Sequence, residues 1–211
     1  MEYLLLLVSI IIGYLIGSIP TAFIFGKILK GIDIRKCGSG NVGATNALRV
    51  LGKGPGICVL LFDAIKGFIT VFFLADFFLR NITIIPVDML RIILGFSCIA
   101  GHNWTIFLGF KGGKGMATSL GVLLGLAFKI AGLQLVLGCT VLTWVVIFII
   151  SRIVSLASVV SAIALPILML VFKQPPVLVI AGFLISGMAI FRHKSNLRRL
   201  LKKEEKPLFK H

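Results

Sequence analysis

The chain has 211 residues, of which 58% are hydrophobic and only 14% are charged, and it carries a formal net charge of +15. This apolar content exceeds what one small soluble core can bury, so composition excludes an ordinary soluble domain. It predicts an all-α, polytopic membrane helix bundle. The excess of cations does not indicate nucleic-acid binding, because the basic residues stand between apolar segments and no nucleic-acid motif accompanies them.

The apolar segments predict seven membrane-spanning helices in one domain, residues 1–211, with a basic tail from about residue 192. A spanning helix needs about 20 predominantly apolar residues. In chain order, the candidate segments are residues 3–26, 56–79, 90–109, 116–128, 130–150, 154–172 and 177–191. The segment at 116–128 is short, so a tilted helix or a broken segment merged with a neighbour stays open.

The distribution of basic residues predicts the orientation. With seven crossings, most lysines and arginines fall in loops on one side and in the tail. The other side receives only Arg80, Arg91, Lys129 and Lys173, and Lys66 lies inside a span. Since basic loops face the cytoplasm, the N-terminus is expected outside and the tail inside.

The first predicted inner loop contains Gly38, Gly40 and Gly43 in the spacing G-x-G-x-x-G. A dinucleotide-binding fold is a poor interpretation, because no strand precedes these glycines. Glycines do let a backbone approach an anion, and Arg49 lies in the first turns of a helix expected from Ala44. An anion site and a simple glycine turn are equally open for this loop alone.

The second predicted inner loop runs from Gly101 and ends in Lys111-Gly112-Gly113-Lys114-Gly115. It is not a P-loop, because Gly115 stands where Ser or Thr would bind Mg²⁺. The lysines are consistent with anchoring a helix end at the membrane surface. Anchoring does not call for three glycines, so the loop favours phosphate binding.

Lys66 lies inside a span, one helical turn after Asp63. A lysine there must pair or line a polar cavity, so it is either a functional residue or part of a pair that braces the helices. A third inner corner at Ser151–Ser155 contains Arg152, and the last span ends at Arg192-His193. Taken alone, His193 is expected to be a solvated histidine at the membrane surface.

Absences restrict the chemistry further. The seven acids are scattered, so neither a paired-carboxylate site nor a metal site is expected. No histidine has an acid near it in the sequence, and no G-x-S-x-G elbow is present. The four cysteines are widely spaced, so no disulfide is expected. Positioning and cations are therefore expected to carry any reaction.

Several motifs in order resemble the bacterial acyl-phosphate:glycerol-3-phosphate acyltransferases of the PlsY family. These are GSIPT at 17–21, GSGNVGATN at 38–46, GHN at 101–103, FKGGKGMAT at 110–118, SRIVSL at 151–156 and RHKSN at 192–196. The resemblance covers nearly the whole chain. Where the family usually has proline after Gly-Ser-Gly-Asn, this chain has Val42, which removes no chemical group.

The resemblance implies an enzyme of the bacterial inner membrane with its active site facing the cytoplasm. It would transfer a fatty acyl group from acyl phosphate to the 1-hydroxyl of sn-glycerol 3-phosphate, giving lysophosphatidic acid and phosphate. No cofactor, metal or nucleic acid is expected. Membrane lipids surround such an enzyme, and a functional link to an enzyme that makes acyl phosphate is expected.

The resemblance also implies roles for residues that match the family motifs. Ser39, Lys114 and His193 are the expected catalytic residues, and together with Arg49 and Asn196 they are assigned mainly to glycerol phosphate. The remaining candidates are expected to bind substrate or brace the site: Gly38, Gly40, Asn41, Asn46, Lys66, Lys111, Arg152 and Ser155.

A membrane transporter of phosphate esters or other anions is the alternative function. Glycine-interrupted helices and the intramembrane Lys66 are compatible with it. A transporter should offer polar groups to both sides of the membrane in turn. The predicted outer loops, such as residues 174–176, are short and nearly featureless, which favours the enzyme.

Overall fold

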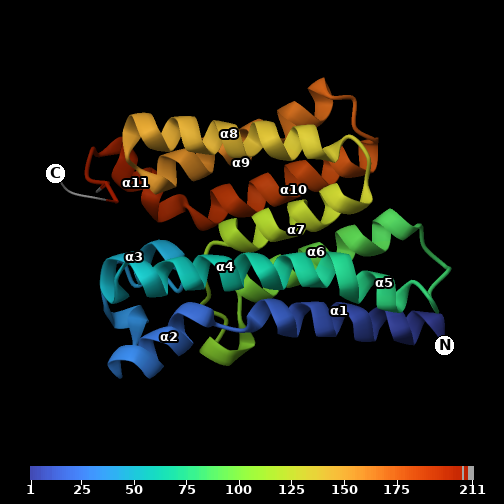
Figure 1. The fold of residues 1–211 in the computed structure, drawn as a ribbon, viewed down its shortest axis with the longest axis horizontal. Helices are drawn as coiled ribbons and strands as arrows, with labels where there is room; N and C mark the ends of the chain where they lie inside the picture. The colour runs from blue at the N-terminus through green and yellow to red at the C-terminus, as the bar shows by residue number, and fades with distance from the viewer. Residues whose placement is uncertain (206, 209–211) are drawn as a thin grey trace. The chain divides into compact units, whose positions relative to one another are not determined.

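The computed structural model describes residues 1–205, 207 and 208, and every regular element in that part of the chain is a helix (Figure 1). Lys206 and Lys210 of the predicted basic tail lie outside the described residues. The chain divides into two compact units, Met1–Lys129 and Ile130–His211, and each is described by itself.

The first unit contains ten helical elements among its described residues. These are α1 (Glu2–Ser18), α2 (Thr21–Lys30), η1 (Ile34–Lys36), α3 (Ala44–Leu51), α4 (Lys53–Ile69), η2 (Thr70–Leu74), α5 (Ala75–Phe78), α6 (Val87–Asn103), η3 (Ile106–Leu108) and α7 (Met116–Lys129). Helix α1 packs against α6, and α4 packs against α7 (Figure 1).

The first predicted span, residues 3–26, is wrong as a single helix. It consists of α1 and α2, which are separated by Ile19 and Pro20. Proline lacks a backbone N–H and disfavours helical backbone at the residue before it, and Ile19 accordingly has ψ 112°. The break turns the Ile19 carbonyl away from α1, where it accepts a hydrogen bond from a side chain of another helix.

The third predicted span, residues 90–109, also ends earlier than expected. Helix α6 stops at Asn103, and Trp104 leaves the helix with φ −131° and ψ 61°. Thr105 fixes this exit because its hydroxyl donates a hydrogen bond to the Ser18 carbonyl, with 2.6 Å between the oxygens. The segment after Asn103 therefore turns back over the end of α6 and does not extend it.

The second predicted span, residues 56–79, begins earlier, at Lys53, and is not a uniform α-helix. It comprises α4, the π-helical segment η2 and α5. The π segment begins one turn after Lys66. The Thr70 hydroxyl donates to the Lys66 carbonyl at 2.8 Å, so local backbone irregularity and the intramembrane lysine occur together.

Glycines allow the helices of the first unit to pack closely. A Cβ at Gly17 of α1 would collide with the Cys98 backbone of α6, and one at Gly101 of α6 would collide with the Tyr14 carbonyl of α1. Gly121 of α7 faces the Ala64 carbonyl of α4 in the same way. Small residues at such crossings are how helices pack tightly in a membrane, where lipid provides no hydrophobic driving force between helices.

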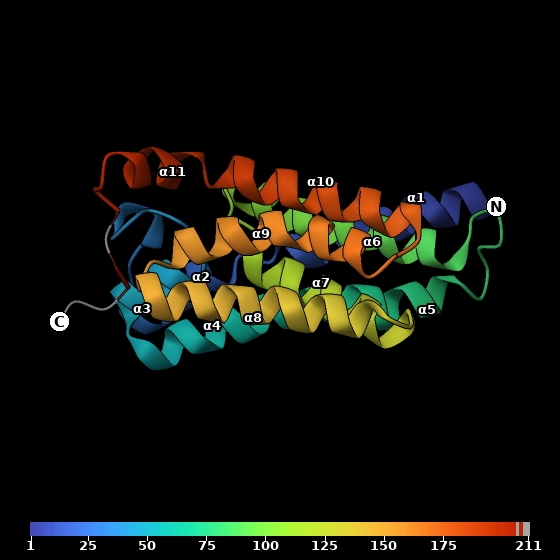
Figure 2. The same cartoon turned by 90° about the horizontal axis from the view of Figure 1, so that it is seen from above.

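The second unit consists of α8 (Leu133–Ser151), α9 (Val154–Val171), α10 (Pro176–Arg192) and α11 (Lys194–Leu201). Helix α9 packs against both α8 and α10, and α11 follows α10 after a bend of 63° (Figure 2). Arg152 joins α8 to α9 with left-handed backbone, φ 58°.

Within the described residues, four helical segments are long and apolar enough to cross a membrane by length and composition: Glu2–Lys30, Lys53–Phe78, Leu133–Ser151 and Val154–Val171. The bent pair α10 and α11 makes a fifth if it is one span. Helix α7 is apolar but has 14 residues, in keeping with the short segment expected there. Many large apolar side chains of these helices are exposed, as a lipid environment requires.

Candidate active site

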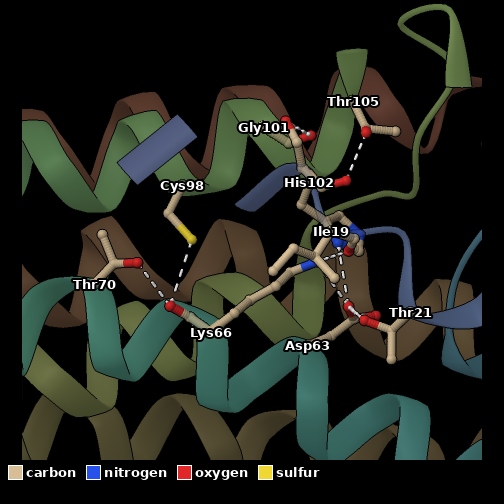
Figure 3. A network of polar contacts seen from close by, with 10 residues as sticks. Ile19, Thr21, Asp63, Lys66, Thr70, Cys98, Gly101, His102 and Thr105 are labelled. Carbon is tan, nitrogen blue, oxygen red and sulfur yellow. Dashed lines mark hydrogen bonds and ion pairs between the residues drawn. The ribbon is translucent and has the colours of Figure 1, made fainter. Parts of the chain in front are cut away.

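A buried polar cluster centred on Asp63 lies inside the first unit (Figure 3). The Asp63 side chain is 2% exposed. Its Oδ1 accepts a hydrogen bond from the Thr21 hydroxyl at 3.0 Å and pairs with the Lys66 ammonium at 2.8 Å. The Nδ1 atom of His102 lies 3.6 Å from the same oxygen. Three helices, α2, α4 and α6, therefore supply partners for one carboxylate.

Lys66 connects this cluster to the break between α1 and α2. Its Nζ donates to the Ile19 carbonyl at 3.0 Å, and its own carbonyl accepts from Thr70 and from the Cys98 thiol, with Sγ 3.7 Å away. The expected Asp63–Lys66 pair is thus present. The role of Lys66 in binding substrate stays a prediction.

No histidine has an acid near it in the sequence, but His102 has one near it in three dimensions. Asp63 and His102 are far apart in sequence, and the packing of α4 and α6 brings them together. Sequence contained one usable signal: a buried carboxylate and lysine inside a membrane span both require partners. It did not say which residue would be the partner.

Asn46 organises the first glycine loop. Its Oδ1 accepts from the Ser39 N–H at 2.9 Å, and its Nδ2 donates to the carbonyls of Cys37 and Ile34 at 3.1 and 3.3 Å. Gly38, with φ 60°, has no room for a side chain because a Cβ there would collide with the Asn46 amide. The loop is therefore held in shape by a residue that was expected to bind substrate.

The second glycine loop rests on the C-terminal end of α6. The Gly112 N–H donates to the Asn103 carbonyl at 3.2 Å, and the Gly113 N–H donates to the His102 carbonyl at 3.0 Å. The Asn103 side chain is fully buried, lies against Gly115, and its amide has no hydrogen-bond partner within the described part of the chain. Helix α7 begins at Met116, directly after this loop.

The two glycine loops meet at Gly113. A Cβ built there would lie 2.8 Å from the Val42 carbonyl oxygen and would also collide with the His102 ring. The first unit thus brings together two loops that are more than 60 residues apart in the sequence. The candidate residues of the two loops differ in exposure. The exposed ones are Gly38, Ser39, Arg49 and Lys111, and the partly buried ones are Gly40, Asn41 and Lys114.

The second unit contains a separate cluster around Glu205. Its carboxylate accepts hydrogen bonds from the Ser155 hydroxyl at 2.9 Å, the Asn196 amide at 2.6 Å and Arg199 Nε at 2.6 Å. Burial opposes ionisation, but these three hydrogen bonds outweigh it and hold the pKa of Glu205 below its ordinary value. Sequence reasoning did not identify Glu205, which looked like one more charge of a basic tail.

His193 is 3% exposed, so the expectation of a solvated histidine is wrong. Its Nδ1 lies 2.8 Å from the Ala189 carbonyl. A carbonyl oxygen only accepts hydrogen bonds, so Nδ1 carries a proton.

Arg152 is exposed, and its carbonyl accepts from the Leu208 N–H at 3.0 Å. The second unit therefore brings Ser155 and Asn196 together through Glu205.

Comparison with known proteins assigns the chain to a family. Residues 7–203 match the family model described as glycerol-3-phosphate acyltransferase. A glycerol-3-phosphate acyltransferase of Synechococcus sp. (strain CC9902) is 45% identical over 195 residues, which cover 92% of this chain and 91% of the relative. One from Desulforamulus reducens is 42% identical over 199 residues, covering 94% and 93%.

Solved structures agree. The fold matches the crystal structure of PlsY, an integral membrane glycerol 3-phosphate acyltransferase, in its glycerol 3-phosphate form, with a TM-score of 0.83 and 36% identity over 96% of this chain and 94% of that one. The lysophosphatidic acid form of PlsY matches with a TM-score of 0.81. Together with the apolar helices and the motifs, these matches confirm the expected family: the chain belongs to the glycerol-3-phosphate acyltransferases of the PlsY type and is an integral membrane protein.

Proposed function

We propose that this protein transfers a fatty acyl group from acyl phosphate to the 1-hydroxyl of sn-glycerol 3-phosphate, giving lysophosphatidic acid and inorganic phosphate. The observation that carries the proposal is the meeting of two glycine loops at Gly113, next to Lys114 and the N-terminus of α7. A helix N-terminus and a lysine suit a phosphate group, and both proposed substrates carry one. PlsY itself has glycerol 3-phosphate and lysophosphatidic acid forms, which supports the acceptor and the product.

The reaction needs no covalent intermediate with the protein. The hydroxyl oxygen of the acceptor forms an ester bond to the acyl carbonyl carbon, the bond from that carbon to the phosphate oxygen breaks, and phosphate leaves. The hydroxyl proton passes to a phosphate oxygen of the acceptor. Acyl phosphate is already activated, so positioning and neutralisation of phosphate charge supply most of the acceleration. Ser39, Lys114 and His193 are the proposed catalytic residues.

The other candidate residues divide between the two substrates in this proposal. Arg49 and Asn196 hold glycerol phosphate. The acyl-phosphate side is assigned to residues that bind it or brace its loops: Gly38, Gly40, Asn41, Asn46, Lys66, Lys111, Arg152 and Ser155.

The protein is proposed to lie in the inner membrane of a bacterium with its active site facing the cytoplasm. In this proposal the chain crosses the membrane seven times, with its N-terminus outside and its glycine loops in the cytoplasm. The site would then face the side on which the soluble acceptor is available. The bias of basic residues supports this orientation. The acyl phosphate would be supplied by an enzyme that makes it.

Phosphate release by the purified protein tests the reaction. Wild type is assayed with palmitoyl phosphate, with and without glycerol 3-phosphate, beside Lys114→Ala and the control Lys202→Ala, which removes a lysine of the exposed tail. Acceptor-dependent release that only Lys114→Ala loses is expected. Turnover with acyl-CoA but not with palmitoyl phosphate would refute acyl phosphate as the donor. If no turnover is measured with either donor, the acyltransferase activity is refuted and the transporter function is favoured.

His193→Ala separates two routes for the proton. If the acceptor phosphate takes the proton, the variant should raise the KM for glycerol 3-phosphate and retain turnover at saturation. Complete loss of turnover with unchanged binding of glycerol 3-phosphate would instead identify His193 as the base.

A further inference from the structure

The position of His102 between Asp63 and the second glycine loop points to a role that the proposed reaction does not yet include. We propose that Asp63 and His102 are positioning residues that hold the loop Lys111–Gly115 in its phosphate-binding conformation. This inference rests on the proposed function, because that function assigns the loop to a substrate phosphate.

His102 contacts the loop in two ways. Its carbonyl accepts the Gly113 N–H at 3.0 Å, and its ring faces the Cα of Gly113 so closely that a Cβ there would collide with Nε2. A shift of the last turn of α6 would therefore move Gly113 through this hydrogen bond, and the ring fills the space beside Gly113. Since a Cβ at Gly113 would also lie 2.8 Å from the Val42 carbonyl oxygen, we expect the position of one glycine loop against the other to depend on His102.

Asp63 holds the other side of the ring. His102 Nδ1 lies 3.6 Å from Asp63 Oδ1, and both side chains are buried. The Lys66 ammonium lies 2.8 Å from the same carboxylate and pairs with it. The ring therefore has Nδ1 on the side of Asp63 and Nε2 on the side of Gly113.

The cluster has rigid support. Thr21 donates to Asp63 from the first residue of α2, and Lys66 donates to the Ile19 carbonyl at the break before that helix (Figure 3). The carboxylate is thus held by Thr21 directly and is linked to Ile19 through Lys66. Supporting residues of this kind orient the groups that touch a ligand without touching it themselves.

The test compares Asp63→Asn and His102→Gln with Asp76→Asn in the full-length protein. Asp76 is the control because it is also an acid of the first unit that pairs with basic side chains, Arg91 and Lys129, and neither of these ion pairs includes a residue of a glycine loop. Hydrogen exchange of peptides spanning residues 103–116 reports loop conformation without substrate. Steady-state kinetics with palmitoyl phosphate and glycerol 3-phosphate report binding and turnover separately.

Asp63→Asn and His102→Gln should each speed exchange in the loop and raise a phosphate-substrate KM by roughly 10- to 100-fold, with a smaller change in kcat. Asp76→Asn should leave both unchanged. The inference would be refuted if hydrogen exchange in the loop were unchanged in Asp63→Asn and His102→Gln. It would also be refuted if Asp76→Asn sped exchange in the loop as much as they do. If wild type fails to use acyl phosphate, the proposed function fails, whereas the exchange comparison still decides the inference.

Thr21→Val provides a milder variant if Asp63→Asn does not fold. It removes one hydrogen-bond donor to Asp63 and keeps the side-chain shape. A smaller increase of loop exchange in the same peptides is expected, and Thr21→Ser should restore the wild-type rate because it restores the hydroxyl. Failure of serine to restore the rate would contradict a role through the Asp63 hydrogen bond.

Discussion

Glu205 accepts a hydrogen bond from the side-chain amide of Asn196, with 2.6 Å between Oε1 and Nδ2. The same oxygen accepts from the Ser155 hydroxyl, so one carboxylate joins the first turn of α9 to α11. Asn196 is a proposed ligand of glycerol phosphate. Its amide orientation therefore depends on a residue that lies beyond the helices and beyond every motif found in the sequence.

Glu205→Gln should destabilise the protein by roughly 1 kcal/mol and raise the KM for glycerol 3-phosphate. Glutamine keeps the shape but loses the charge that pairs with Arg199 and strengthens the bonds from Ser155 and Asn196. Thermal unfolding in detergent and steady-state kinetics measure the two effects. The neighbouring Glu204→Gln, at an exposed position, is the control, and equal effects in both variants would refute this role.

The same carboxylate predicts a pH dependence. Its pKa in the folded protein lies below its ordinary value, so the ionised form favours folding. The stabilisation is complete above the ordinary pKa of about 4.3 and is lost as the pH falls through the lowered value. The difference in unfolding temperature between wild type and Glu205→Gln should therefore be largest near neutral pH and shrink in acid. A difference that grows in acid would contradict the assignment.

Gly121→Ala should be strongly destabilising, by about 1–3 kcal/mol, because the added methyl would collide with the Ala64 carbonyl where α7 crosses α4. Gly138→Ala in α8 is the control, since a Cβ there meets nothing within 4 Å. Alanine also favours helix at that site. Thermal unfolding of both variants checks the pair, and equal stability would show that α4 and α7 do not cross this closely.

Asn103→Leu should separate stability from function. The buried amide of Asn103 has no hydrogen-bond partner within the described part of the chain, so replacing it with an apolar group of similar size should leave stability unchanged or raise it. If the amide serves the phosphate site beside Gly115, affinity for a phosphate substrate should fall. Thermal unfolding and KM measure the two. A destabilised variant with unchanged KM would show a purely structural amide.

The fold class and the family follow from the amino-acid sequence. Apolar content and segment length predict membrane helices whatever the packing, because a bilayer leaves the backbone few other solutions. The motifs GSGNVGATN and FKGGKGMAT identify the two glycine loops, since closely spaced glycines and cations carry local information about how a backbone meets an anion. Helix ends were predicted less well: Pro20 and Thr105 break helices that hydrophobicity alone had extended.

The packing of the helices determines which residues act together. Asp63 and His102 meet because α4 and α6 contact each other, and Val42 reaches Gly113 although the two loops are distant in sequence. Glu205 gains its role from the turn after α11, which returns it to Ser155. Such contacts depend on helix crossings and chain reversals that no local pattern encodes. For that reason the sequence located the glycine loops, while only the packed helices showed what holds them in place.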